Sequence, residues 1–248
     1  MKRLLILGGT GDGVELASEA TKISGVEVIS SLAGRTIAPK SLVGAVRIGG
    51  FGGEAGLVEY LQAEQIDLLI DATHPFAANI SWNAAGAARQ VGIPWLMLIR
   101  PGWERLPGDD WIEVGSVEAA VVAIPASAGR IFLTIGRQQV ALFAGLTGKW
   151  CLIRSIDLPD SSILLPPGEV LLDRGPFSLD QELQLLRDYR IDAIVSKNSG
   201  GDATYAKIIA ARELGIPVVM VQRSIVPEGD VVTSVSGAIE WLIKTINN

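Results

Sequence analysis

The sequence predicts an α/β protein built of two related Rossmann-like halves, each with a parallel sheet. Short apolar runs recur along the chain, as expected for strands that are buried on both faces. The first run, 4–7, is followed by a glycine-rich turn at 8–13 and by a helical pattern from Val14. Strand, glycine-rich turn and helix in this order begin nucleotide-binding α/β domains. The third observation is that the whole pattern restarts in the second half of the chain.

The glycine-rich turn is the first candidate binding element. Glycine lets backbone N–H groups approach a phosphate closely, and a helix N-terminus adds a partial positive charge. We therefore expect Gly9, Thr10, Gly11 and Asp12 to bind the phosphates of a dinucleotide. The usual G-x-G-x-x-G spacing is incomplete, because Val14 stands where the last glycine would be. A tight strand-to-helix turn without a ligand is the alternative interpretation.

Composition excludes several classes of protein. Of the 248 residues, 48% are hydrophobic and 19% charged, which indicates a compact globular chain. A net charge of -6 and a pI near 4.9 argue against nucleic-acid binding. With Cys151 and His74 the only residues of their kinds, an internal disulfide and the usual metal sites are not expected. Met1 leads directly into the first strand and no apolar stretch suits a membrane span, so we expect a cytoplasmic protein.

The second strand, 26–31, ends where a dinucleotide site meets the adenosine ribose. A carboxylate there suits NAD, whereas Ser31, Arg35 and Thr36 suit the 2′-phosphate of NADP. Arg35 as a solvated loop charge remains the alternative.

A second glycine cluster follows at 49–53 and contains one aromatic residue. Its Gly50, Phe51 and Gly52 form a backbone that a flat ligand or a diphosphate can approach, so they are further cofactor-binding candidates. A flexible turn with Phe51 in the core is the alternative.

Polar side chains follow the third strand, 66–71. Ligands of open α/β sheets bind at the carboxyl ends of strands, which is where Asp71, Thr73 and His74 are expected. Thr73 is a cofactor-binding candidate, and Asp71 and His74 are catalytic candidates; a lone histidine can equally be structural. A helix at 79–91 and a strand at 94–99 complete this half.

The sequence repeats after a boundary near residue 107. The runs 130–137, 191–195 and 215–223 match 3–9, 66–70 and 92–100 in order and at nearly constant spacing. We therefore divide the chain into a dinucleotide-binding domain, 1–107, and a substrate-binding domain, 108–248. The amphipathic C-terminal helix, 235–246, is the one segment that we allow to pack back on the first domain. The two sheets are expected to face one another across a cleft for a cofactor and a large substrate.

The second half lacks the glycine-rich turn, because Gly136 is followed by Arg137. Its most informative stretch is 196–205, directly after a strand. Lys197, Asn198, Ser199 and Gly200 there are suited to bind carboxylates or a diphosphate. A helix start capped by Ser199 or Asp202 is the alternative.

These runs together resemble the precorrin-6A reductase family of cobalamin biosynthesis. The matching stretches are 6–13, 49–53, 71–77, 134–137, 174–177 and 196–201. The resemblance implies reduction of one double bond of the precorrin-6A macrocycle, or of its cobalt form, to precorrin-6B. It implies NADPH as the hydride donor, with NADH also possible, and a small-molecule substrate rather than a nucleic acid or a membrane.

The substrate of that family carries many carboxylates, which need basic partners. Arg137, Arg174 and Lys197 are suitable, together with Asn198 and the loop that follows it. Reduction also requires a proton, for which His74, Asp71, Lys197 or water are candidates. No metal is required.

Two other functions remain open. A regulatory protein could sense NAD(P) with the same turn and without catalysis. A short-chain dehydrogenase would have a similar first turn but requires a Tyr-x-x-x-Lys pair; Tyr60 lacks such a lysine, and Tyr205 and Lys207 are separated by one residue only.

Overall fold

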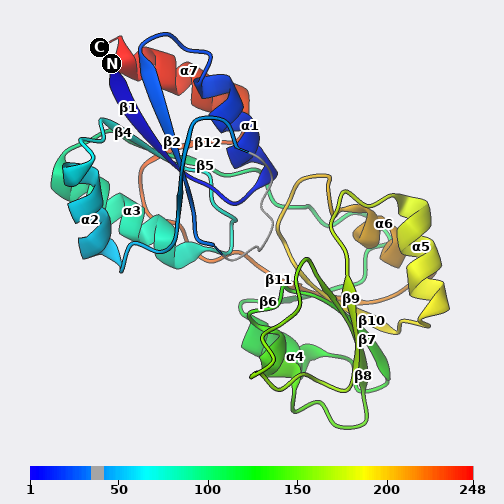
Figure 1. Ribbon diagram of the computed structural model, residues 1–248. Coiled ribbons are helices and arrows are strands. Elements are labelled where there is room, and N and C mark those ends of the chain that lie inside the picture. The colour runs from blue at the N-terminus through cyan, green and yellow to red at the C-terminus, as the bar shows by residue number, and fades with distance from the viewer. Residues whose placement is uncertain (35–41, 248) are drawn as a thin grey trace. The chain divides into compact units, whose positions relative to one another are not determined.

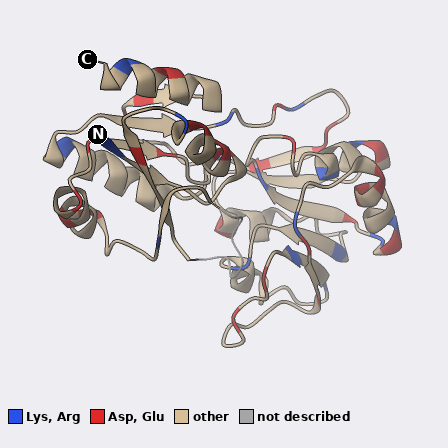
Figure 2. Cartoon of the chain, turned by 45° about the horizontal axis from the view of Figure 1, so that its top comes forward, with Lys and Arg blue, Asp and Glu red and all other residues tan. Residues whose placement is uncertain are grey.

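The computed structural model describes residues 1–34 and 42–247, which form two compact units. The first unit consists of Met1–Pro101 and Ser224–Asn248, and the second of Gly102–Arg223. Each contains a six-stranded, all-parallel sheet among the described residues, with helices on both faces (Figure 1). The predicted fold class, α/β with two related Rossmann-like halves, is thereby confirmed. Acidic and basic side chains are spread over both units (Figure 2).

The first sheet has the strand order β3-β2-β1-β4-β5-β12, the order of a doubly wound fold. Its strands are β1 (Lys2–Leu7), β2 (Val26–Leu32), β3 (Ala45–Ile48), β4 (Leu68–Asp71), β5 (Trp95–Leu98) and β12 (Asp230–Val232). Its helices are α1 (Gly11–Ala20), α2 (Glu54–Ala63), α3 (Ala78–Val91) and α7 (Val235–Ile246). The helices α1 and α7 lie on one side of the sheet, and α2 and α3 on the other (Figure 1).

Alternation along β1 explains why the sheet is covered on both faces. Leu4 and Ile6 point into the core under α1 and α7, whereas Leu5 and Leu7 point into the core under α2 and α3. All four side chains are buried. A strand that is apolar at every position needs two apolar layers, which is the arrangement of parallel sheets.

The second sheet repeats this order as β9-β8-β7-β10-β11-β6. Its strands are β6 (Trp111–Val114), β7 (Arg130–Thr134), β8 (Trp150–Ser155), β9 (Gly168–Leu172), β10 (Ala193–Lys197) and β11 (Val218–Val221). Its helices are α4 (Val117–Ala123), the 3₁₀ helix η1 (Val140–Phe143), α5 (Leu179–Asp188) and α6 (Ala206–Leu214). The core around Phe132, Ile194 and Met220 is covered by α5 and α6, and α4 packs beside β6 and β11.

The division of the chain differs from the predicted one in two respects. It falls between Pro101 and Gly102 rather than at 107/108, and all of residues 224–248 belong to the first unit, where only the C-terminal helix was allowed to pack. The reason is long-range pairing: β12 extends the first sheet by pairing with β5. The helix α7 buries Ala238 and Leu242 in the core beside α1. It thereby covers the same face of the first sheet as α1 does.

Candidate functional site

The glycine-rich turn lies where the first sheet changes direction. From β1 the chain passes through α1 to β2 on one side, whereas β4 pairs with β1 on the other. Thr10 caps α1 by accepting a hydrogen bond from Gly13 N at 3.0 Å, and its hydroxyl donates to the carbonyl of Ala72, beyond β4, at 2.8 Å. The turn is thereby fixed at the switch point, the place where doubly wound sheets bind ligands.

The glycines of this turn serve different purposes. A Cβ at Gly13 would lie 3.4 Å from the Cα of Gly8 and 3.5 Å from the Cβ of Ala72, which is ordinary van der Waals contact between helix and strand. Gly9 has a φ of +119°, which favours glycine. Gly11 shows neither constraint: its φ lies outside the left-handed region, and a Cβ there would meet no heavy atom within 4 Å. The fold does not require glycine at position 11.

The polar residues after β4 also lie at this edge. Asp71 is buried, and its Oδ1 accepts hydrogen bonds from the backbone N of Thr73 at 3.0 Å and from its hydroxyl at 2.6 Å. His74 is exposed, and its Nδ1 accepts from Phe76 N at 3.2 Å. Asp71, Thr73 and His74 line a small hollow together with residues 224–227, with room for about one water molecule (≈ 10 Å³). The structure therefore brings these three predicted residues together.

Asp12 and Ser31 complete this edge. Asp12, in the first turn of α1, forms an ion pair with Arg100 at 3.4 Å. Ser31 is buried at the end of β2, and its Oγ lies 3.4 Å from Nη1 of Arg47. Arg35 and Thr36, predicted beside Ser31, lie outside the described residues.

The second glycine cluster leads from β3 into α2. Phe51 is half-buried and contacts the ring of Tyr60 edge to face, at 5.2 Å between centroids. Gly50 and Gly52 on either side are exposed or partly exposed, and a Cβ at either would meet no heavy atom within 4 Å. The cluster thus combines an anchored aromatic ring with an open backbone.

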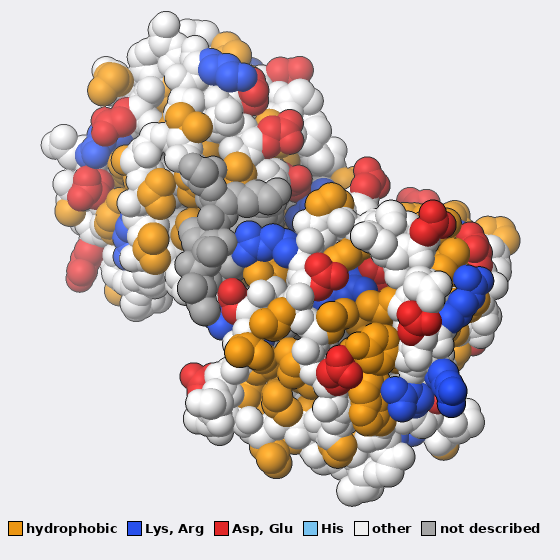
Figure 3. All heavy atoms as spheres, turned by 45° about the vertical axis from the view of Figure 1, so that its right-hand side comes forward, with side chains coloured by type: hydrophobic (Ala, Val, Ile, Leu, Met, Phe, Trp, Pro, Cys, Tyr) orange, Lys and Arg blue, Asp and Glu red, His pale blue; other side chains and the backbone are white. Residues whose placement is uncertain are grey.

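The second unit gathers its predicted basic residues at the carboxyl edge of its own sheet. Arg137 follows β7, Arg174 follows β9, and Lys197 ends β10. Nη1 of Arg137 donates to the carbonyl of Leu158 at 3.2 Å, in the connection between β8 and β9. Apolar side chains of that connection are exposed, and Figure 3 shows apolar side chains gathered on the surface of this unit. The exposed apolar residues of the connection between β8 and β9 include Ile156, Leu158 and Leu164.

Asn198 has a structural task. Its Oδ1 accepts from the backbone N of Trp103 at 2.7 Å, and its Nδ2 donates to the carbonyl of Trp103 at 3.0 Å and to Gln222 at 3.3 Å. The indole of Trp103 in turn donates to the carbonyl of Gly201 at 2.8 Å. These bonds hold the loop with Ser199 and Gly200, so the amide of Asn198 is engaged with the protein.

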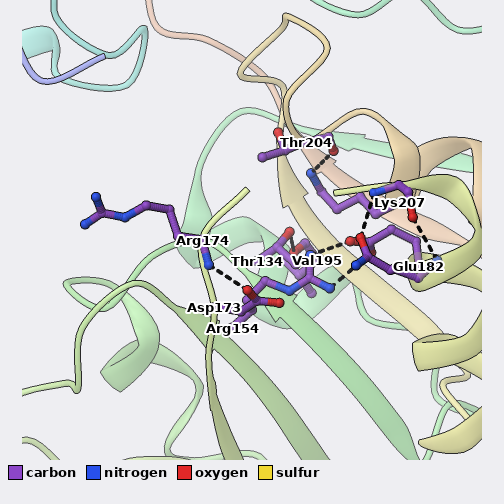
Figure 4. A network of polar contacts seen from close by, with 10 residues as sticks. Thr134, Arg154, Asp173, Arg174, Glu182, Val195, Thr204 and Lys207 are labelled. Carbon is purple, nitrogen blue, oxygen red and sulfur yellow. Dashed lines mark hydrogen bonds and ion pairs between the residues drawn. The ribbon is translucent and has the colours of Figure 1, made fainter. Parts of the chain in front are cut away.

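A buried cluster of charges lies near the same edge (Figure 4). Arg154, at the end of β8, forms two hydrogen bonds to Glu182 in the first turn of α5, at 2.6 and 3.1 Å. Its guanidinium is enclosed by the rings of Phe132 and Phe177. Lys207, in the first turn of α6, donates to the carbonyl of Thr204 at 2.7 Å. Burial lowers the pKa of Lys207 to about 7, partly offset by Glu182 and reinforced by Arg154.

Comparison with known proteins agrees with this architecture. The family described as precorrin-6x reductase CbiJ/CobK matches residues 3–243. The precorrin-6A reductase of Rhodococcus erythropolis is 50% identical over 244 residues, which cover 98% of both chains. The chain belongs to the precorrin-6x reductase family. The resemblance seen in the sequence is thereby confirmed, and the chain is an oxidoreductase of cobalamin biosynthesis.

Two further relatives cover nearly the whole chain. The precorrin-6A reductase of Mycobacterium tuberculosis is 46% identical over 243 residues, 98% of each chain. The solved structure titled CobK precorrin-6A reductase superposes with a TM-score of 0.92 at 42% identity, covering 98% of this chain and 97% of that one. Within the described part of this reductase, no helix is both long and apolar enough to cross a membrane.

Sequence reasoning missed two groups of residues at these edges. The first is Arg47, which could have been proposed as a ligand-binding residue because it lies just before the second glycine cluster. The second is the cluster of Arg154, Glu182 and Lys207, which could not have been predicted because its members are far apart in the sequence. The sequence around Lys207 is typical of an exposed helix lysine.

We predict that Lys207 makes stability depend on pH. Its folded-state pKa is about 7, below that of an unfolded lysine near 10.4, so between these values the folded protein binds fewer protons and stability rises with pH. In Lys207→Met this contribution is absent. The difference in melting temperature, variant minus wild type, should decrease as the pH is raised from 7 to 10. Below pH 6.5 it should stay constant. Lys244→Met, at an exposed lysine, is the control, and parallel curves for Lys207→Met would contradict the prediction.

Proposed function

We propose that this reductase transfers a hydride from NADPH to one double bond of precorrin-6A and so forms precorrin-6B. The observation that carries the cofactor assignment is the open space at Gly11, in a turn fixed at the switch point of the first sheet. An open glycine at the N-terminus of α1 lets a phosphate approach the backbone N–H groups of the turn, in the space that a side chain would otherwise occupy. The names of the relatives support the substrate.

The first unit supplies the groups suited to a dinucleotide. Backbone N–H groups of Gly9–Asp12 and the N-terminus of α1 suit its phosphates. Gly50–Gly52 suit the adenosine part, and Thr73 with its neighbours after β4 suits the nicotinamide part. Bound NADPH supplies the hydride. We propose NADPH over NADH because Ser31 stands at the end of β2, where an NAD site has a carboxylate; the predicted contribution of Arg35 belongs to this proposal.

The second unit supplies groups suited to a macrocycle rimmed by carboxylates. Arg137, Arg174 and Lys197 provide cationic donors at one edge of the sheet. The exposed apolar side chains after β8 provide a surface that suits the faces of the ring. Asn198 contributes by holding the backbone of the loop at Ser199 and Gly200.

Reduction of the double bond adds a hydride to one carbon and a proton to its neighbour, and NADPH becomes NADP⁺. Asp71 is a candidate for orienting or relaying the proton, because two hydrogen bonds from Thr73 fix its carboxyl group. His74 lies exposed in the same small hollow and is a second candidate. Lys197 and water remain the other candidates.

The direct test is consumption of NADPH by the purified protein. We expect the absorbance of NADPH to fall only when precorrin-6A is present, with one equivalent oxidised for each macrocycle reduced. NADPH binding without turnover, with precorrin-6A and with its cobalt form alike, would instead favour the dinucleotide-sensing regulator.

Gly11→Val tests the phosphate site. The fold leaves room for the side chain, so the variant should melt like the wild type, while the valine occupies the phosphate position and abolishes NADPH binding. Gly145→Val is the matched control, because a Cβ at Gly145 also meets no heavy atom within 4 Å and the residue lies in the second unit. If a folded Gly11→Val variant bound NADPH with unchanged affinity, the phosphate site would have to lie elsewhere.

Lys197→Ala tests the division of labour between the units. Loss of one charge-assisted hydrogen bond, about 1.5–3 kcal/mol, should weaken macrocycle binding or turnover by roughly ten- to a hundred-fold. NADPH affinity should change by no more than a few-fold. The control is Arg187→Ala, which removes an exposed positive charge from the last turn of α5. Steady-state kinetics and a cofactor titration separate the outcomes, and a selective loss of NADPH affinity would assign Lys197 to the cofactor.

A further inference from the structure

Arg47 occupies a defined position beside the end of β2. It lies on β3, in register with Ser31 of β2, so both residues are at the carboxyl edge of the first sheet. Its Nη1 donates to the carbonyl of Gly49 at 2.5 Å and its Nη2 to the carbonyl of Gly50 at 2.8 Å. The guanidinium is therefore tied to the start of the second glycine cluster.

An aromatic surface fixes the plane of the guanidinium. Its Cζ lies 3.8 Å from the centroid of Phe51 and 5.1 Å from that of Tyr60. The two rings contact each other edge to face, so they form one support. A guanidinium held on aromatic rings and by two carbonyls has few alternative positions, which reduces the entropy lost when it binds a ligand.

In the described part of the first unit, Arg47 forms no ion pair with a carboxylate. The hydrogen-bond partners found there are neutral oxygens of Gly49, Gly50 and Ser31. A guanidinium has five N–H donors, and these three contacts leave donors on Nε and Nη2. A half-buried cation that keeps donors and is not ion-paired to a carboxylate is suited to bind an anion.

We propose that Arg47 binds the 2′-phosphate of NADPH and thereby selects it over NADH; this inference rests on the proposed dinucleotide site of the first unit. In a doubly wound sheet the adenosine ribose lies at the end of the second strand, where Ser31 and Arg47 are adjacent. The phosphate is a dianion that compensates the charge of Arg47, and its oxygens accept from a guanidinium fork. Arg47 is thus a specificity-determining residue of the cofactor site, in addition to the proposed contributions of Ser31 and Arg35.

A purely structural task for Arg47 predicts a different result. Gly49, Gly52 and Gly53 all have positive φ values, so this backbone depends on its anchors, and the guanidinium bonds are among them. Loss of an anchor would weaken every ligand that contacts the loop by a similar factor. Loss of a phosphate partner weakens only ligands that carry the 2′-phosphate.

The experiment compares ligands that differ in that phosphate alone. Wild type, Arg47→Gln and Arg47→Lys are titrated with NADPH and NADH, and with the fragments 2′,5′-ADP and 5′-AMP. We expect Arg47→Gln to lose about ten- to a hundred-fold in affinity for NADPH and 2′,5′-ADP and less than three-fold for NADH and 5′-AMP. Arg47→Lys keeps the positive charge but not the two parallel N–H donors of a guanidinium. Its affinity for NADPH should therefore lie between those of the wild type and of Arg47→Gln.

Arg89→Gln is the matched control, because it removes an exposed arginine in the last turn of α3. Its affinities for all four ligands should equal those of the wild type. Equal losses for NADPH and NADH in Arg47→Gln, or no loss for NADPH, would overturn the inference while the dinucleotide site stands. A wild type that binds neither NADPH nor NADH would overturn the proposed function itself.

If Arg47→Gln does not melt cooperatively, Arg47→Lys decides alone. A selective loss of NADPH affinity in Arg47→Lys supports the inference, and an unchanged ratio of NADPH to NADH affinity overturns it.

Discussion

Parallel pairing of β1 with β2 on one side and β4 on the other is the constraint on which the first unit depends. It forces each connection to return over a face of the sheet, so helices cover both faces and β1 is apolar at successive positions. It also brings the carboxyl ends of all six strands to one edge. The hydrogen bond from Thr10 to the carbonyl of Ala72 then joins the loops on the two sides of the switch point. The polar groups of this edge are held by the sheet rather than by the loops alone.

The sequence was most informative where the structure is locally determined. The central strands are continuous apolar runs, and their positions, their order and the repeat agree with the structure because burial on both faces leaves a clear pattern. Edge strands such as β3 and β12 are short and partly exposed, so they leave little pattern. The pattern of the C-terminal helix reveals that one face is apolar, but it does not reveal which of the two cores that face packs against. The sequence also placed Asn198 correctly at the end of a strand. It could not show that the amide of Asn198 is hydrogen-bonded to the backbone of Trp103, because Trp103 is distant in the sequence.

The charges of the second unit illustrate how local and overall electrostatics differ. The chain carries a net charge of -6, yet the buried cluster near the carboxyl edge holds two basic side chains and one carboxylate. Arg154 and Glu182 are joined by two hydrogen bonds, which offset part of their desolvation, whereas Lys207 donates to a carbonyl rather than to a carboxylate. A chain that is acidic overall can therefore hold a local excess of basic side chains in the interior of one unit.

The order of strands along the chain bears on how the protein forms during its synthesis. The strand β6 and helix α4 follow β5 in the sequence but belong to the second unit, and β12 and α7 follow β11 but belong to the first. The second unit is one continuous segment, so it is complete once Arg223 has left the ribosome. The first unit begins earlier and finishes later, because α1 waits for Ala238 and Leu242 to cover its apolar face. In vectorial folding the domain made first is therefore the domain completed last.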